Sequence, residues 1–154
     1  MARQGYTLIE LLIVFSIIGI LLGMGVVAYN DFNKRQTLKG AALNLKNDLR
    51  QAQNKALAGE KTCTGSLDGY EVSFSSTSYN FRAKCGTNYG TAITTFLPTN
   101  VSIANSPSPF VFKVLGQGVT AAQTICLSGF NKIYKISVTV SGEIKDEGFV
   151  GTCP

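Results

Sequence analysis

The 154-residue chain contains no histidine and no tryptophan, and it has only four prolines. Without histidine it lacks the side chain that most often serves as a general base and most often binds a metal ion. Its four cysteines include no C-x-x-C pair, so the spacing typical of a zinc site is also missing. No nucleophile–base pair replaces these groups. The composition therefore argues against an enzyme, and we expect no metal and no cofactor.

The charge of the chain is only mildly basic, with 14 Lys and Arg against 9 Asp and Glu. That excess is far from the charge of a dedicated nucleic-acid arm. Its distribution is more informative, because the apolar block Leu11–Ala28 carries no charge at all. As a helix this block would cover about 27 Å, which nearly spans a hydrocarbon core. It therefore predicts a membrane segment or a signal sequence.

All four cysteines follow the apolar block. An even number of cysteines is typical of disulfide bonds formed outside the cytoplasm, and four free thiols in a cytosolic protein are the alternative. More than one pairing is possible. We expect two local bridges, Cys63–Cys85 and Cys126–Cys153, each of which would stabilise the fold by roughly 3–4 kcal/mol on the chain-entropy model.

The N-terminal edge of the apolar block contains one ionisable residue, Glu10. Thr7 stands three residues earlier, which makes a capping box, and Tyr6 and Leu11 are placed as a hydrophobic staple across it. This local motif accounts for Glu10. It does not account for the short basic leader that ends at Gly5.

The run Gly5–Leu12, with the sequence GYTLIELL, resembles the class III signal of type IV pilins and type II secretion pseudopilins. That signal is a short basic leader ending in Gly, followed by a hydrophobic helix with Glu in fifth position. The resemblance implies cleavage by a prepilin peptidase between Gly5 and Tyr6 and N-methylation of Tyr6. It also implies subunit assembly through Glu10, whose carboxylate pairs with the N-terminal amine of a neighbouring subunit. The chain departs from the pattern in having Tyr6 for the commoner Phe, and Val27 where many major pilins have Pro.

Two observations compete with the class III signal and with an extracytoplasmic C-terminal domain. The small residues 26–28 before Tyr29 suit an ordinary secretory cleavage, and Lys34 and Arg35 would favour a cytoplasmic C-terminus by the positive-inside rule. The leader and the cysteines favour the opposite orientation. We therefore expect a single-pass inner-membrane precursor with an extracytoplasmic C-terminal domain, found after assembly in an extracellular or periplasmic filament.

Helical periodicity continues beyond the apolar block. Small and apolar residues recur at spacings of three and four, and Gly59 is suited to end the helix as a C-cap. A helix from Thr7 to Ala58 would be roughly 75–80 Å long. The amphipathic stripe consists of Leu38, Ala42, Leu45, Leu49, Ala52 and Ala56.

A set of basic side chains runs beside this stripe within a narrow arc of the helix. This basic ridge is interpreted first as a solvated flank. Binding to an anionic partner, such as DNA or phospholipid headgroups, is the alternative. The ridge consists of Arg35, Lys39, Lys46 and Arg50.

After Gly59 the hydrophobic period changes from that of a helix to that of strands. Tyr70–Phe74 and Tyr79–Ala83 predict a hairpin, Phe110–Leu115 a further strand, and Tyr134–Val140 another before a turn. The predicted fold class is α+β, with a long N-terminal helix packed on a small antiparallel β-sheet domain. The expected parts are a leader (1–5), a transmembrane or filament-core helix (6–28), an amphipathic half-helix (29–58) and a β domain (59–154).

A second resemblance, to the GspH/FimT group of minor subunits, covers scattered residues, and Gln53 and Lys55 depart from that group's helix pattern. Together the resemblances imply a structural (minor) pilin or pseudopilin whose partners are other subunits, the prepilin peptidase and the inner membrane. A DNA-binding minor pilin of a DNA-uptake pilus and a type II secretion pseudopilus subunit are the alternatives. The matching residues are Asp48, Leu49, Ala52, Ala56 and 140–144.

Overall fold

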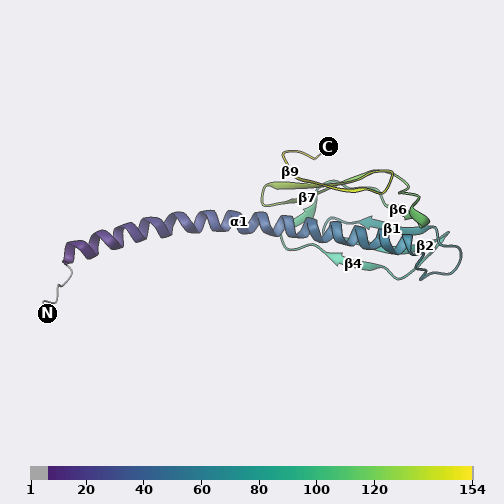
Figure 1. Cartoon of the computed structure of the whole chain (residues 1–154), viewed down its shortest axis with the longest axis horizontal. Coiled ribbons are helices and arrows are strands. Elements are labelled where there is room, and N and C mark those ends of the chain that lie inside the picture. Colours follow the sequence, from purple (N-terminus) through teal and green to yellow (C-terminus); the bar gives the residue numbers. More distant parts are fainter. Residues whose placement is uncertain (1–6, 154) are drawn as a thin grey trace. The chain divides into compact units, whose positions relative to one another are not determined.

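The structure is a computed structural model that describes the backbone of residues 7–153 and the side chains of residues 7–21 and 29–153. Within these residues one long helix, α1 (Leu8–Leu57), precedes all the strands and the short 3-10 helix η1 (Val114–Gly116) (Figure 1). The predicted helix is confirmed, with both ends within one residue of the expected positions. The predicted cleavage site at Gly5 and Tyr6 lies outside the described residues.

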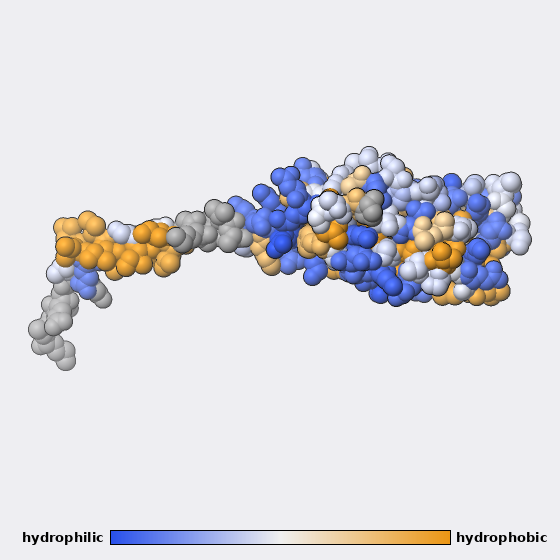
Figure 2. Space-filling model, turned by 90° about the horizontal axis from the view of Figure 1, so that it is seen from above, coloured by the Kyte–Doolittle hydropathy of each residue, from blue (hydrophilic) through white to orange (hydrophobic). Residues whose placement is uncertain are grey.

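The chain folds as two compact units, Met1–Lys34 and Arg35–Pro154. In the first unit the large apolar side chains of α1 that the structure describes are exposed, Leu8 to 82% and Phe15 to 68%. Figure 2 shows them as a hydrophobic surface. The Ser16 hydroxyl donates to the Leu12 carbonyl at 2.8 Å, so its polar group is satisfied within the helix. Among the residues with described side chains, no helical stretch reaches the length and mean hydropathy of a membrane span.

The C-terminal end of α1 is a Schellman motif. The Gly59 N–H donates to the Ala56 carbonyl at 3.2 Å, and the Glu60 N–H donates to the Lys55 carbonyl at 3.0 Å. Gly59 has a φ of 66°, a left-handed conformation that glycine adopts without a steric penalty from Cβ. The prediction that Gly59 ends the helix is confirmed.

The second unit contains two antiparallel sheets. The first has the order β3-β2-β1-β6, with β4 also paired to β2, and the second has the order β5-β7-β8-β9. The first sheet consists of β1 (Gly69–Phe74), β2 (Ser78–Cys85), β3 (Asn88–Tyr89), β4 (Ile93–Phe96) and β6 (Phe110–Lys113). The second consists of β5 (Val101–Ile103), β7 (Gln123–Gly129), β8 (Lys132–Val138) and β9 (Ile144–Val150).

The predicted hairpin is β1–β2, with Val72 opposite Phe81. The predicted strand from Phe110 ends at Lys113, because the chain turns into η1 and Leu115 takes a left-handed φ of 54°. The hydrophobic pattern predicted a single antiparallel sheet, whereas the structure shows two sheets. Strand β7 is one of the two inner strands of the second sheet. It lacks an alternating pattern because three consecutive residues of it, Ile125 to Leu127, are buried.

The core of the second unit lies between the C-terminal half of α1 and both sheets (Figure 1). All six residues of the predicted amphipathic stripe are at most 1% exposed. They pack in one cluster with aromatic and aliphatic residues from both sheets. The sheet residues with the largest fully buried side chains are Tyr79, Phe81, Phe110, Phe112, Ile125, Leu127 and Ile136.

Candidate functional site

Glu10 lies in the first turn of α1 and is exposed. Its backbone N–H donates to Thr7 Oγ1 at 3.4 Å and to the Thr7 carbonyl at 3.2 Å, so Thr7 is the N-cap residue. This contact is one half of the predicted capping box. No hydrogen-bond partner of the Glu10 carboxylate lies among the residues whose side chains the structure describes. The carboxylate is therefore available to a group outside them.

The surroundings of Glu10 give this carboxylate its chemical significance. Leu8, Ile9 and Leu12 around it are more than half exposed, so an apolar helix surface carries one acidic group. If that surface is buried, in lipid or against other helices, Glu10 is buried with it. A buried carboxylate is stable only when it is paired or protonated, so this geometry calls for a cationic partner.

The predicted cysteine pairs are confirmed. The Cα atoms are 6.0 Å apart in Cys63–Cys85 and 6.1 Å apart in Cys126–Cys153, within the usual range for a disulfide. No free cysteine occurs among the described residues. The first bridge ties the loop after α1 to the end of β2, and the second ties the C-terminal tail to β7.

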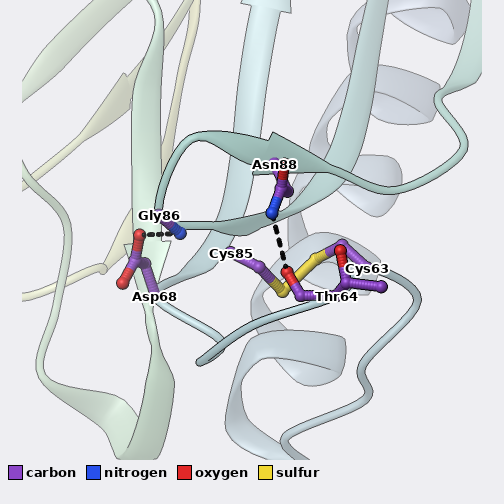
Figure 3. Close-up of a disulfide and its surroundings, with 6 residues drawn as sticks. All are labelled: Cys63, Thr64, Asp68, Cys85, Gly86 and Asn88. Atoms are coloured by element: carbon purple, nitrogen blue, oxygen red, sulfur yellow. Dashed lines mark hydrogen bonds between the residues drawn. A yellow bond between two sulfur atoms is a disulfide. The ribbon is translucent and has the colours of Figure 1, made fainter.

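Hydrogen bonds brace the loop around Cys63–Cys85 (Figure 3). Asp68 Oδ2 accepts a hydrogen bond from the Gly86 N–H at 2.8 Å, and Asn88 Nδ2 donates to the Thr64 carbonyl at 3.2 Å. The bridge therefore belongs to a small bonded cluster at the end of the hairpin.

The fold places the four residues of the basic ridge in different surroundings. The Arg35 guanidinium carbon lies 5.4 Å from the centre of the Phe149 ring, a cation–π contact, and Lys46 Nζ lies 3.4 Å from Asp146 Oδ2. Lys39 and Arg50 are exposed. Two of the four cations are thus engaged within the domain, which weakens the hypothesis of a continuous phosphate-binding ridge.

Asp146 joins α1 to the second sheet. Its Oδ1 accepts hydrogen bonds from the Tyr134 hydroxyl at 2.7 Å and from the Gly148 N–H at 3.2 Å, while Lys46 contacts Oδ2. Burial raises the pKa of the Asp146 carboxyl, but the bonds from Tyr134, Lys46 and Gly148 and the charge of Lys46 outweigh it. The net pKa therefore lies below its usual value.

This lowered pKa predicts acid sensitivity. The carboxylate favours the folded state, and that contribution is complete above the unfolded pKa of about 3.9 and is lost as the pH falls further. Asp146→Asn should lower the free energy of unfolding by about 1 kcal/mol near neutral pH. The difference from the wild type should shrink between about pH 4 and pH 2. Denaturant titrations at several pH values test this, and a difference that is constant with pH would contradict it.

The sequence did not predict one set of hydrogen bonds between α1 and the first sheet. Asp48 Oδ2, on α1, accepts hydrogen bonds from the Tyr79 hydroxyl at 2.8 Å and from Thr95 Oγ1 at 3.0 Å. Burial and the Asp48 carboxylate both raise the pKa of Tyr79, which holds its hydroxyl protonated as the donor. Asp48 directly precedes Leu49 of the apolar stripe, but nothing in the sequence indicated which strands would meet it.

A comparison with known protein families matches residues 1–26 to the prokaryotic N-terminal methylation motif. No curated protein matches the chain. No solved structure matches it either. The family match covers the leader, the exposed Glu10 and most of the apolar block. The chain therefore carries the class III signal of type IV pilin-like proteins, which marks a membrane-anchored precursor that a prepilin peptidase processes.

Proposed function

We propose that the chain is a minor pilin or pseudopilin, a structural subunit of a type IV pilus-like filament. The observation that carries the proposal is the exposed Glu10 on the apolar first part of α1, within the methylation motif. The precursor is held in the inner membrane by residues 6–28, and the prepilin peptidase removes the leader, residues 1–5. Its C-terminal domain then faces the extracytoplasmic side.

Assembly on this proposal transfers the apolar helix surface from lipid to a bundle of equivalent helices. Both surroundings are apolar, so the transfer does not expose the side chains of Leu8–Leu21 to water. The Glu10 carboxylate meets the N-terminal amine of a neighbouring subunit in low dielectric, where opposite charges attract far more strongly than in water. The charge pair would thereby set the register between subunits.

The second unit suits a position on the outside of such a filament. It has its own buried core and two disulfides, so its packing does not depend on the apolar helix surface of the first unit. Disulfides persist in the oxidising surroundings of an exported domain. We assign no chemistry to this domain and propose that it is structural.

The proposal predicts the start of the mature protein. In cells that contain a prepilin peptidase, the chain should begin at Tyr6 and carry an N-methyl group, and the intact mass of the purified chain measures both. Gly5→Val should leave the leader uncleaved, because the added side chain occupies the cleavage position. A mature chain that begins at Tyr29 would identify an ordinary secreted β protein and contradict the filament proposal.

A further inference from the structure

The second unit has a groove of about 670 Å³, and Arg35 is one of the residues that line it. The turn between β7 and β8 forms one wall, and the end of β9 forms another. In that turn Phe130 and Asn131 have φ values of 55° and 59°, a two-residue turn closed by the pair Gly129 and Lys132. The Phe130 ring packs on the core, which accounts for a left-handed conformation that is unusual for this residue.

Arg35 is held in place at the mouth of this groove. Its guanidinium stacks on Phe149, whose ring meets the Tyr134 ring edge-on at 5.0 Å between centroids. A stacked guanidinium keeps its N–H edges free for hydrogen bonds, because the stack uses only its face. Among the described residues, no carboxylate forms an ion pair with Arg35. The stack therefore fixes a cation whose N–H edges are available to an anionic acceptor.

The other lining residues suit an anion with hydroxyl groups. None of the described residues that line the groove is acidic. Asn100 and Asn131 offer side-chain amides, and Ser102 and Ser128 bond to each other through their hydroxyls at 3.1 Å, which leaves one proton of that pair to donate. Such donors match the oxygens of a phosphodiester and of a glycerol.

We propose that the groove binds the headgroup of an anionic phospholipid, with its phosphate on the Arg35 guanidinium and its glycerol hydroxyls on the Asn and Ser side chains. The proposal rests on the membrane-anchored precursor proposed above. Arg35 follows the end of the apolar block by seven residues, or about 10 Å of helix. A site at that distance lies close to the headgroup layer, where basic residues are attracted to anionic lipid.

A phospholipid headgroup fits these observations better than duplex DNA. DNA binding needs several cations that contact successive phosphates, whereas Lys46 of the basic ridge is engaged by Asp146 and Arg35 is turned onto Phe149. The groove holds its donors in a hollow around the stacked guanidinium, and Lys132 is the one other cation among its described lining residues. That arrangement suits a single phosphate group with a small polar substituent.

The test uses the full chain in a nonionic detergent, titrated with short-chain phosphatidylglycerol. Hydrogen exchange should slow in peptides that cover residues 127–134 and 147–153. Short-chain phosphatidylcholine should give little protection, because it has no net negative charge. Glycerophosphoglycerol, which has the same phosphodiester without acyl chains, should bind more weakly. Equal protection by either compound would overturn the assignment to an anionic lipid.

Two substitutions and one matched control localise the site. Arg35→Gln should weaken phosphatidylglycerol binding about tenfold, and Arg35→Lys should weaken it nearly as much, because lysine keeps the charge but loses the planar fork and the stack. Lys39→Gln removes a neighbouring exposed cation outside the groove and should leave the affinity within about twofold. Unchanged exchange in β1 and β2 would show that each variant is folded. A full effect of Lys39→Gln, or none of Arg35→Lys, would show diffuse attraction and overturn the site.

Membrane retention separates failure of this inference from failure of the proposed function. If the chain stays in the membrane fraction after carbonate extraction but phosphatidylglycerol protects neither peptide, only the groove assignment is wrong. If the chain leaves the membrane, the proposed precursor is wrong as well. Protection of the same peptides by duplex DNA, in place of lipid, would overturn the lipid assignment in favour of nucleic acid.

Discussion

Replacing Glu10 by Gln is expected to leave the chain cleaved, helical and membrane-inserted. We expect its incorporation into filaments to fall by roughly tenfold or more. The amide keeps the size and hydrogen-bonding capacity of the side chain and removes its charge. In the assembled bundle the amine of the neighbouring subunit would then be buried without a counter-charge, which costs about 3–5 kcal/mol. The exposed carboxylate of Glu10, without a partner among the residues whose side chains the structure describes, is the observation behind this expectation.

Thr7→Ala is the matched control, because Thr7 Oγ1 accepts the Glu10 N–H and supplies the cap. Loss of an N-cap hydroxyl costs about 1 kcal/mol and leaves the charge of Glu10 intact. A capping box accepts Gln as well as Glu, so a purely capping role predicts normal incorporation of Glu10→Gln and impaired incorporation of Thr7→Ala. The pairing role predicts the reverse. Quantifying each subunit in sheared filament fractions, with processing checked by mass, decides between them.

Removing the Cys126–Cys153 bridge should have a large effect on the stability of the second unit. The sequence separation of 27 residues gives a loop whose closure stabilises the fold by roughly 3–4 kcal/mol on the chain-entropy model. That is a large part of the roughly 5–15 kcal/mol typical of a domain. The bridge also holds the C-terminal tail on β7, where Cys126 is fully buried.

The double variant Cys126→Ala, Cys153→Ala tests this without placing a hydroxyl in the buried Cys126 position. Its denaturation midpoint is compared with that of the wild type and with that of Cys63→Ala, Cys85→Ala, whose loop of similar length should matter by a similar amount. Adding a reductant to the wild type should reproduce the loss from both bridges. A double variant within about 1 kcal/mol of the wild type would show that the bridge contributes little.

Several features could be predicted because their causes are local in sequence. The stripe from Leu38 to Ala56 is a matter of helical spacing, and Gly59 ends α1 because its own φ is left-handed. The cysteine pairs are also local, with separations of 22 and 27 residues. Glu10 was found because the leader and the helix start form one continuous motif.

Other features depend on contacts that no local pattern encodes. Strand β7 is an inner strand of the second sheet and buries consecutive residues, so it has no alternation to detect. Asp48 could be placed on α1, but its bond to Thr95 joins residues 47 apart. That bond depends on where β4 joins the edge of the first sheet.

The basic ridge shows most clearly what the sequence determined and what the tertiary structure determined. The sequence by itself determined that Arg35, Lys39, Lys46 and Arg50 share one flank of a helix, because helical geometry repeats every few residues. Only the tertiary structure decided that Lys46 meets Asp146, 100 residues away, and that Arg35 lies over Phe149 beside a groove. Helical spacing is set by backbone hydrogen bonds between near neighbours, whereas those partners are brought together by the packing of β9 against the helix.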